Sequence, residues 1–520
     1  MSSPKIYSSL PSITSIRLLR LDSGDVDDPL SCSLIVVEDY ASAPEYHALS
    51  YCWGDAKDKV ELLCNGMPFS ATKNLRSALL CLRKKTVSEL VWADAICINQ
   101  KDGQERNQQL SVMKQIYLLA SRVFIWIGHG DETTGPAMKL IRTIGHGCCK
   151  EIHGSDVSPI LCLASLRSDP DRTQRVTSTN LTELVERTRI DWQLIWKFYQ
   201  SAWFFRVWVI QEVRGCMEIS LLCGEEEIEW ELVVLAANWV SHAFDRDPKI
   251  HWTMNYLPSF TGFQNAFFMW DQSCVRREAP FLALLNLVRR FHSTDPRDKV
   301  FALLQHPILQ TRTHDQNHRT AIEYSPKLAH AVSNEISQFM LFARVTHLDF
   351  KADYEMTVGE VYRRVALDSI HSYRSLEVLC YAWQTQHLDV SLPSWIPRWD
   401  IPFDIRTVLL PFIYDAAEGT VPQLRPSPNL HTLTVQGLNL GQILEVDCVL
   451  RFDKSLARTA GSNKEQSTEG LLMIMSRILV QDRWQEDISL EIAARRSHEN
   501  LEAHFADFSA FLLSQVMISK

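Results

Sequence analysis

The chain has 520 residues, of which 46% are hydrophobic and 22% charged, and its formal net charge is -9. This composition is typical of a globular protein with two or three domains; it excludes a largely disordered chain and argues against a dedicated nucleic-acid-binding protein. No apolar stretch is long enough to span a bilayer, and the scattered cysteines show no disulfide spacing, so we expect a cytoplasmic protein with reduced thiols.

The first 85 residues are predicted to form strands that end in turns. We expect an edge strand over 15–21, a short strand over 34–37 and a longer one that begins at Tyr46 and ends at the turn Gly54-Asp55. Asn65-Gly66 is a strong turn pair and predicts a hairpin over 60–70. Apolar residues at helical spacing then predict a helix over 75–82, with Thr72 or Asn74 near its cap.

Residues 90–128 are predicted to form a strand, a helix and a second strand. The first strand is expected over 90–98 with Asp94 in its middle, and the second over 123–127. Between them, an apolar stripe predicts one helix that extends to residue 120, with Asp102 as its cap and Glu105 completing a capping box. An apolar strand covered by helices is typical of a parallel sheet, so this unit predicts an α/β layer.

The rest of the chain is predicted to be mainly helical, with small β elements. The aromatic run from Trp192 predicts one helix with Phe205, Trp208 and Glu212 on one face. The other expected elements are a helix at 135–145, a polar insertion at 165–190, a strand at 219–223, helices at 230–243 and 281–291, a helix with Pro296 in its first position, a helix opened by the capping box of Thr357 and Glu360, an irregular stretch at 392–400, a hairpin at 433–443 and two helices after 465.

Candidate binding residues cluster where predicted parallel strands end. Ligands of open parallel sheets bind at the carboxyl ends of the strands, here near Gly54, Asn99 and Gly128. Asp94, in an apolar strand, would need a partner or a role because an unpaired buried carboxylate is costly. Two interpretations remain open: a crevice for a phosphate-bearing nucleotide, or a structural ion pair of Arg206 with Asp94 or Glu212.

Several common chemistries are disfavoured. The chain has no Walker loop, no GxGxxG after a strand and no GxSxG elbow, which argues against classical NTPases, dinucleotide oxidoreductases and α/β-hydrolases. The His and Cys residues at 146, 148, 149, 153 and 162 match no standard zinc spacing, so no metal is expected.

Three blocks of the sequence resemble the fungal heterokaryon incompatibility (HET) domain. They are Tyr46-His-Ala-Leu-Ser-Tyr-Cys-Trp-Gly-Asp55, Val91-Trp-Ala-Asp-Ala-Ile-Cys-Ile-Asn-Gln100 with Glu105-Arg106, and Trp203-Phe-Phe-Arg-Val-Trp-Val-Ile-Gln-Glu212. We call them the first, second and third blocks. Segments 295–304 and 392–399 and the hairpin around Gly437 also resemble parts of full-length HET proteins, so the resemblance covers about the first 450 residues.

The resemblance implies a domain organisation and a role. A HET domain is expected over 1–215, with its core at 44–214, followed by a mainly helical α+β region over 216–450 and a divergent helical tail over 451–520. The implied role is nonself recognition and the programmed cell death that follows fusion of incompatible hyphae.

HET domains are also similar to TIR domains, which have a flavodoxin-like parallel sheet and in some cases cleave NAD. The first block is similar to the TIR strand-A block, and 208–212 is similar to the TIR Trp-Cys-x-x-Glu helix, although Val209 replaces the Cys. The resemblance therefore implies that Glu212, and with it Asp94, is catalytic. It implies nucleotide binding by Ser50, Trp53, Gly54, Asp55, Arg206 and Trp208, with NAD as a substrate and no permanently bound cofactor.

Two other classes of function stay open. In one, the HET domain is a non-enzymatic signalling module that self-associates, while the C-terminal region senses a protein partner. In the other, the chain is an accessory or tailoring protein of a fungal metabolite gene cluster.

Overall fold

A computed structural model of the chain divides into two compact units. One unit comprises residues 1–276, 287–345 and 349–356, and the other comprises 277–286, 346–348 and 357–520. The structure describes residues 6–25, 28–55, 57–85, 90–153, 158–168, 191–213, 218–246, 262–270, 280–306, 351–373, 377–382, 392–393, 395–401, 424–425 and 434–435.

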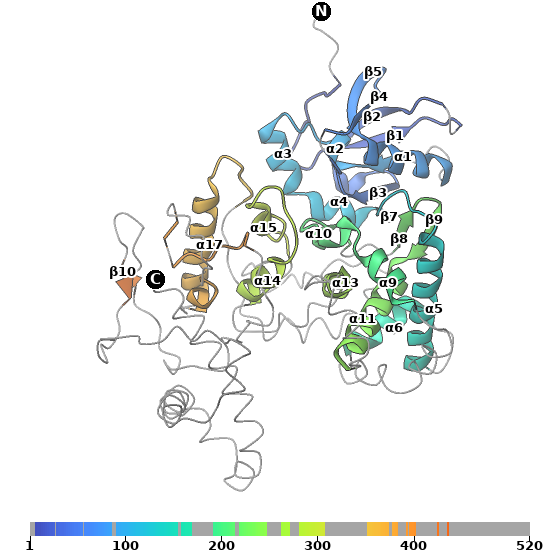
Figure 1. Cartoon of the computed structure of the whole chain (residues 1–520). Helices are drawn as coiled ribbons and strands as arrows, with labels where there is room; N and C mark the ends of the chain where they lie inside the picture. The colour runs from blue at the N-terminus through green and yellow to red at the C-terminus, as the bar shows by residue number, and fades with distance from the viewer. Residues whose placement is uncertain are drawn as a thin grey trace, which may run out of the picture. The chain divides into compact units, whose positions relative to one another are not determined.

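The first unit is built on a nine-stranded mixed sheet (Figure 1). Its four adjacent parallel strands, in sheet order, are β6 (Leu90–Trp92), β3 (Tyr46–Tyr51), β7 (Arg122–Trp126) and β8 (Ile219–Cys223). In chain order this is 2-1-3-4, the order of the flavodoxin-like doubly wound sheet. The predicted α/β layer with a parallel sheet is therefore confirmed.

Antiparallel strands extend the sheet on both sides. On one side lie β1 (Ile16–Leu21), β2 (Ser31–Val37), β4 (Lys59–Cys64) and β5 (Met67–Thr72), with only β2 and β4 parallel to each other; on the other lies β9 (Glu226–Glu229). The prediction that β1 is an edge strand is wrong. It lies between β2 and β6, and even its charged residue, Arg17, is buried. After residue 215, β8 and β9 continue the same sheet.

The β4–β5 hairpin forms as predicted. Asn65 and Gly66 both have positive φ, 53° and 71°, as the two central residues of a type I′ turn require. Glycine adopts this backbone conformation without steric cost, and asparagine is among the residues that tolerate it best.

Between β3 and β7, one predicted helix forms, whereas two other predictions for this stretch are wrong. Helix α1 (Lys73–Lys85) is capped by the Thr72 hydroxyl, which accepts from Leu75 N–H at 3.3 Å. The predicted strand over 90–98 is wrong in its second half, because Asp94 begins helix α2 (Asp94–Cys97).

The single helix predicted up to residue 120 is also wrong. The chain forms α3 (Gly103–Leu110) and α4 (Met113–Leu119), separated by two residues. The Gln305 amide lies at this break, where it donates to Leu110 O at 3.1 Å and accepts from Lys114 N–H at 3.1 Å. A side chain from a distant segment therefore pairs the backbone groups that the break leaves open.

The aromatic run after Trp192 is not one helix. It divides into α9 (Trp192–Tyr199), a 3-10 turn η2 (Ala202–Phe205) and α10 (Val209–Glu212), with Arg206 in extended conformation at φ -73° and ψ 135°. Arg206 forms an isolated bridge with His292, and Val207 N–H donates to His292 O at 3.0 Å. Pairing with a distant segment thus replaces the helix.

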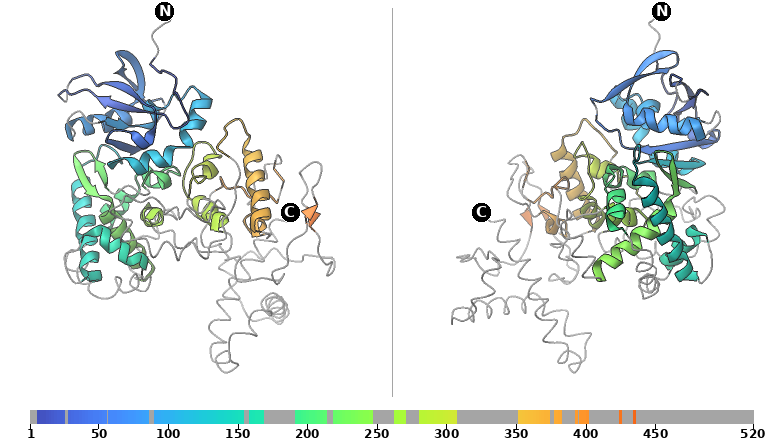
Figure 2. Two further views of the ribbon diagram at one scale, coloured as in Figure 1. Left: turned by 180° about the vertical axis from the view of Figure 1, so that it is seen from behind. Right: turned by 45° about the vertical axis from the view of Figure 1, so that its right-hand side comes forward.

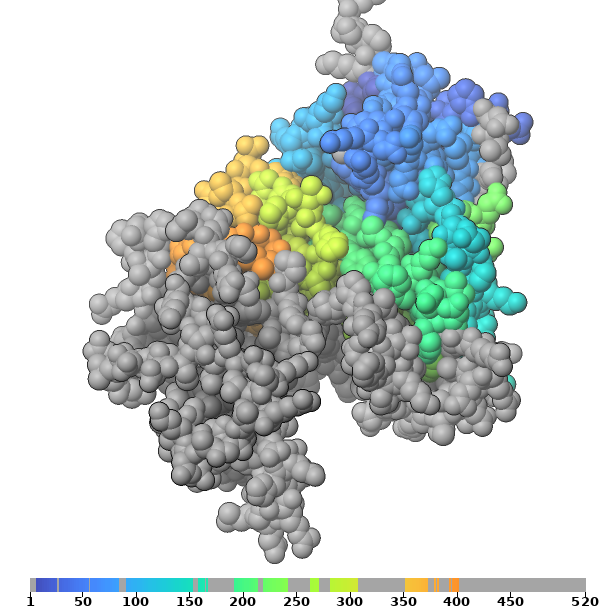
Figure 3. Space-filling view, viewed as in Figure 1, coloured from blue at the N-terminus to red at the C-terminus, as the bar shows by residue number. Residues whose placement is uncertain are grey.

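A helical layer packs beside the sheet in the first unit. Helix α5 (Thr134–His153) lies along α11 (Trp230–Arg246), with α9 against α5, and the views of Figure 2 show α5 and α11 side by side. On the face shown in Figure 3, the blue N-terminal strands and the green segment around α9 to α11 form one continuous surface. Helix α6 (Pro159–Ser168) contacts both α5 and α11.

The remaining described elements are mainly helical, as predicted. Thr357 and Glu360 form the expected capping box: the Glu360 carboxylate accepts from the Thr357 N–H at 2.7 Å, and Glu360 N–H donates to the Thr357 hydroxyl at 3.3 Å. The remaining described elements are η1 (Tyr40–Ser42), α13 (Gly262–Trp270), α14 (Pro280–Val288), α15 (Asp298–Phe301), α17 (Val358–Tyr373), η5 (Glu377–Tyr381), β10 (Leu424–Arg425) and β11 (Thr434–Val435).

Pro296 does not occupy the first position of a helix. It lies in a turn in which the Asp295 carboxylate accepts from the Arg297 N–H at 3.0 Å, and α15 begins two residues later. Most of the polar insertion at 165–190, most of the hairpin at 433–443 and the two tail helices lie outside the described residues. Within the described part of the chain, no helix is long and apolar enough to cross a membrane.

Candidate functional site

The first and third blocks meet at a hydrogen bond between Ser50 and Glu212. Ser50 lies near the carboxyl end of β3 and is buried, and its hydroxyl donates to Oε2 of Glu212. The same hydroxyl accepts from the indole N–H of the buried Trp203 at 2.8 Å. Ser50 is thus held between two residues of the third block, and Glu212 lies at the end of the sheet where a ligand is expected.

Arg206 lies on the other side of the Glu212 carboxylate. Its Nη1 is 3.8 Å from Oε1 of Glu212 and also donates to the backbone carbonyl of Tyr51. Burial is the largest single influence on the pKa of Arg206 and lowers it, but Glu212 and the other acidic groups nearby together raise that pKa by more, so the guanidinium stays cationic. Of the two ion pairs left open for Arg206, the structure forms the one with Glu212.

Glu212 titrates near neutral pH. Its side chain is only 2% exposed, and burial raises its pKa to about 7 against the opposing effects of Arg206 and Ser50. A carboxyl group with such a pKa can exchange a proton near neutrality, and in its ionised form it can stabilise a neighbouring cation.

Trp53 and Asp94 lie at the carboxyl ends of the neighbouring strands β3 and β6. The Trp53 indole N–H donates to Oδ2 of Asp94 at 2.8 Å, and its side chain remains 41% exposed. Asp94 also accepts from Ala95 N–H at 2.7 Å, so it has partners at the start of α2 rather than an isolated position within a strand. Trp53 is therefore a fixed aromatic ring that faces solvent.

The turn after β3 has the conformation that its glycine allows. Gly54 has φ +77°, where a side chain is strained, whereas the Asp55 carboxylate accepts from Lys57 N–H in a local turn. The structure does not bring Asp55 into contact with Glu212 or Arg206. Asn74 was not predicted as a site residue, but its amide links the ends of β3 and β7, with Cys52 O at 2.7 Å and the Trp126 N–H at 2.9 Å.

Trp208 contacts a carboxylate from a later part of the chain. Trp208 and Tyr354 both hydrogen bond to Asp298, the tyrosine hydroxyl at 2.5 Å. Burial raises the pKa of Asp298 to about 6, and these hydrogen bonds and Arg206 oppose the rise. Sequence reasoning missed Asp298 and Tyr354 as site residues, although Asp298 lies in a segment that already resembled HET proteins.

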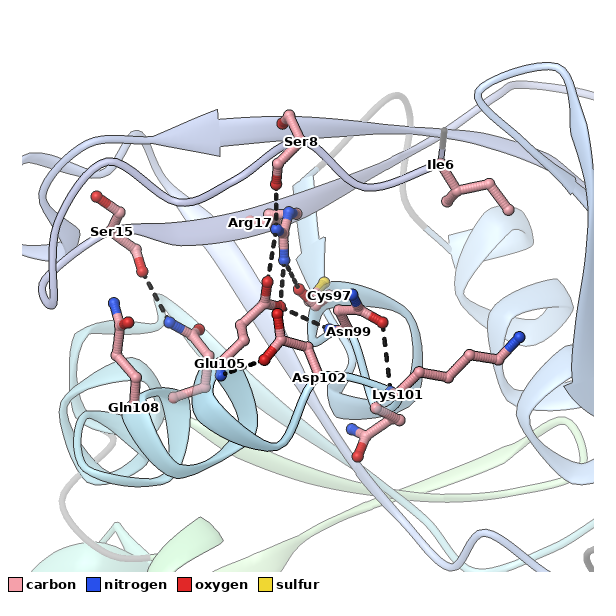
Figure 4. A network of polar contacts seen from close by, with 12 residues as sticks. Ile6, Ser8, Ser15, Arg17, Cys97, Asn99, Lys101, Asp102, Glu105 and Gln108 are labelled. Atoms are coloured by element: carbon pink, nitrogen blue, oxygen red, sulfur yellow. Dashed lines mark hydrogen bonds and ion pairs between the residues drawn. The ribbon is translucent and has the colours of Figure 1, made fainter. Parts of the chain in front are cut away.

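The Glu105 side chain binds Arg17 and the backbone rather than the helix cap. Asp102 caps α3 as predicted, accepting from Glu105 N–H at 3.0 Å. The Glu105 carboxylate instead binds the buried Arg17 through two contacts, at 2.6 and 2.9 Å, and accepts from Asn99 N–H at 2.6 Å (Figure 4). This network joins β1 to the loop that follows α2.

Among the described residues, no group of three His, Cys, Asp or Glu side chains is arranged to hold a metal ion.

The region that contains Ser50, Arg206 and Glu212 matches a known protein family. Residues 46–212 match the family model of the heterokaryon incompatibility protein (HET). The chain carries a HET domain. The HET match begins at the first residue of β3 and ends at Glu212, so β1, β2 and β8 extend the sheet of the HET domain beyond the matched residues.

The similarity to one curated protein extends well beyond the HET domain. The chain is 23% identical over 487 residues to heterokaryon incompatibility protein 6, OR allele, of Neurospora crassa. The match covers 85% of this chain and 66% of the relative, just under two thirds of that protein's length. No solved structure matches the chain.

Proposed function

We propose that this chain acts in fungal heterokaryon incompatibility and that its HET domain cleaves NAD or a related nucleotide, which leads to programmed cell death. The observation that carries the proposal is Glu212, a buried carboxylate with a pKa of about 7 that contacts Ser50 at the end of β3 and faces Arg206. The HET match and the name of the Neurospora crassa relative support the biological role.

The proposed reaction is hydrolysis of the bond between nicotinamide and ribose. As this bond breaks, its electron pair moves to the nicotinamide nitrogen and neutralises the ring, and an oxocarbenium-like centre forms on the ribose. The ionised Glu212 would stabilise that cation. Water then bonds to the ribose carbon and releases a proton, which gives nicotinamide and ADP-ribose.

Two residues at the end of β3 support binding of such a substrate. The exposed ring of Trp53, fixed by its hydrogen bond to Asp94, is suited to stack on a base. Gly54 at the adjacent turn has φ +77°, and a Cβ there would meet Cβ of Asn74 at 3.4 Å, so the turn depends on glycine. Ser50 would orient the Glu212 carboxylate through the hydrogen bond that its hydroxyl donates.

The test is incubation of the purified full-length chain with NAD, with free nicotinamide measured by chromatography. We expect release by the wild type and a loss of at least about 100-fold in Glu212→Gln, because the stabilising charge is removed. Glu61→Gln is the matched control, since Glu61 is exposed on β4. Full cleavage by a well-folded Glu212→Gln would remove Glu212 from the mechanism.

The depth of Glu212 favours a second candidate function. Because the Glu212 side chain is only 2% exposed, its contacts with Ser50 and Arg206 can instead hold the first block against the third. The domain would then be a non-enzymatic signalling module that self-associates. In that case the wild type releases no nicotinamide, whereas Glu212→Gln still abolishes growth arrest in a fungal host. Measuring both quantities on the same variants separates the two functions.

A further inference from the structure

Arg106, the last residue of the second block, lies over an aromatic ring. Its guanidinium carbon is 4.2 Å from the centroid of Tyr354, a cation–π contact. The ring is fixed in turn, because its hydroxyl donates to Asp298 at 2.5 Å. A guanidinium held in this way has lost much of its side-chain freedom before any ligand arrives.

The Arg106 guanidinium has no hydrogen-bond acceptor and no ion-pair partner among the residues that the structure describes. Its Nε is buried and unpaired, whereas its two terminal nitrogens are not buried. A guanidinium has five N–H donors; here the one on Nε is buried without a partner, which is costly, and the four on the terminal nitrogens remain accessible. The side chain is therefore arranged to bind an anion that is supplied from outside.

Other arginines of the same unit have partners. Arg17 binds Glu105 and two backbone carbonyls, and Arg297 binds Asp295 at 2.7 and 2.9 Å and two carbonyls of 354–356 at 2.6 Å. Arg297 also contacts the Tyr354 ring, at 5.0 Å from its centroid. Both oxygens of Asp295 bind Arg297, so Arg106 acts on this carboxylate only through its charge and makes no hydrogen bond to it.

We propose that Arg106, supported by Tyr354, forms a binding site for a phosphate or pyrophosphate group of a nucleotide. The planar guanidinium matches two phosphate oxygens, which it binds through parallel N–H donors. The site is linked to the candidate catalytic residues, because Tyr354 shares Asp298 with Trp208, and Arg206 acts on the same carboxylate. The identification of the ligand as a nucleotide rests on the proposed function.

This assignment replaces an expectation from the sequence. Arg206 was the arginine predicted to help bind the nucleotide, but it is engaged by the Tyr51 carbonyl and by Glu212. Binding phosphate would require Arg206 to leave Glu212, whereas Arg106 has no hydrogen bond or ion pair to lose among the residues that the structure describes.

The test is calorimetric titration of the full-length chain with pyrophosphate, ADP-ribose and adenosine. We expect the two phosphate-containing ligands to bind and the affinity for both to fall at least tenfold in Arg106→Gln. Arg20→Gln is the matched control, because Arg20 is exposed on β1. Binding of ADP-ribose alone would show that the phosphate is recognised as part of a nucleotide, and binding of pyrophosphate as well would show that the anion suffices.

Variants of Tyr354 test the supporting ring. Tyr354→Phe keeps the ring and is expected to bind like the wild type within about threefold, whereas Tyr354→Leu removes the cation–π contact and is expected to weaken binding. The proposal is overturned if a folded Arg106→Gln binds both phosphate-containing ligands as tightly as the wild type, or if the wild type binds neither.

The two proposals can fail separately. Phosphate-dependent binding without release of nicotinamide from NAD would contradict cleavage and leave the Arg106 site standing. Cleavage of NAD with the same KM in the wild type and in Arg106→Gln would contradict the Arg106 site and leave cleavage standing.

Discussion

The first unit contains two arginine–glutamate pairs in which the carboxylate is buried, and the two pairs have opposite properties. Arg17 and Glu105 form two contacts, at 2.6 and 2.9 Å, and they also bind backbone groups of Ser8, Cys97 and Asn99, whereas Nε of Arg17 is buried without a hydrogen bond among the described residues. Arg206 and Glu212 approach only to 3.8 Å, and the pKa of Glu212 is raised to about 7. The first pair holds β1 through short contacts, whereas the second contains a carboxylate whose pKa is raised by burial.

The difference shows why residue type alone does not identify a catalytic carboxylate. Both glutamates belong to blocks that match the HET family, and both lie beside an arginine. Glu105 accepts short hydrogen bonds on both oxygens, whereas Glu212 is buried 3.8 Å from its cation, and burial raises the pKa of Glu212 by more than Arg206 and Ser50 lower it. Three experiments test this contrast.

The largest expected effect is on the Arg17–Glu105 pair. Arg17→Met leaves the Glu105 carboxylate buried without its cation, and we expect a loss of about 3–5 kcal/mol in the free energy of unfolding. Urea unfolding of the full-length chain measures it, with Arg20→Met, an exposed change on the same strand, as the control. Adding Glu105→Leu to Arg17→Met should restore part of the loss, because it removes the unpaired charge. Equal stability of Arg17→Met and Arg20→Met would contradict a structural role for the Arg17–Glu105 pair.

The next effect is the pH dependence that comes from Glu212. Its pKa in the folded protein, about 7, exceeds the ordinary value of 4.5, so the folded state binds more protons between these values and stability falls as the pH rises through this window. The contribution is on the order of 3 kcal/mol. Glu212→Gln should lose this fall in stability between pH 5 and pH 8, and Glu61→Gln should keep it. The same slope in all three proteins would show that the pKa of Glu212 is not raised.

The smallest effect is expected from Ser50→Ala. Removing the hydroxyl takes away the donor to Glu212 and the acceptor of the Trp203 N–H, at a cost of about 1–3 kcal/mol. Because the lost donor favours the ionised carboxylate, the pKa of Glu212 should rise further, and any pH profile of NAD cleavage should shift to higher pH. Ser70→Ala, an exposed change on β5, is the control. A profile that does not move would mean that Ser50 does not act on Glu212.

The sequence by itself determined the features that depend on neighbouring residues. The Asn65-Gly66 turn, the Asp102 cap and the capping box of Thr357 and Glu360 follow from local backbone preferences, and the buried strands follow from their apolar pattern. The carboxyl ends of parallel strands were correctly expected to gather at one edge, because the topology requires it.

The tertiary structure decided what depends on partners far along the chain. Pairing with His292 ends the predicted aromatic helix at Arg206, and Gln305 occupies the break between α3 and α4. The partners of Trp208 and Arg106 are also distant in sequence, at Asp298 and Tyr354. No local pattern encodes such pairings, since they form only when packing brings distant segments together and their burial sets the charge of each group.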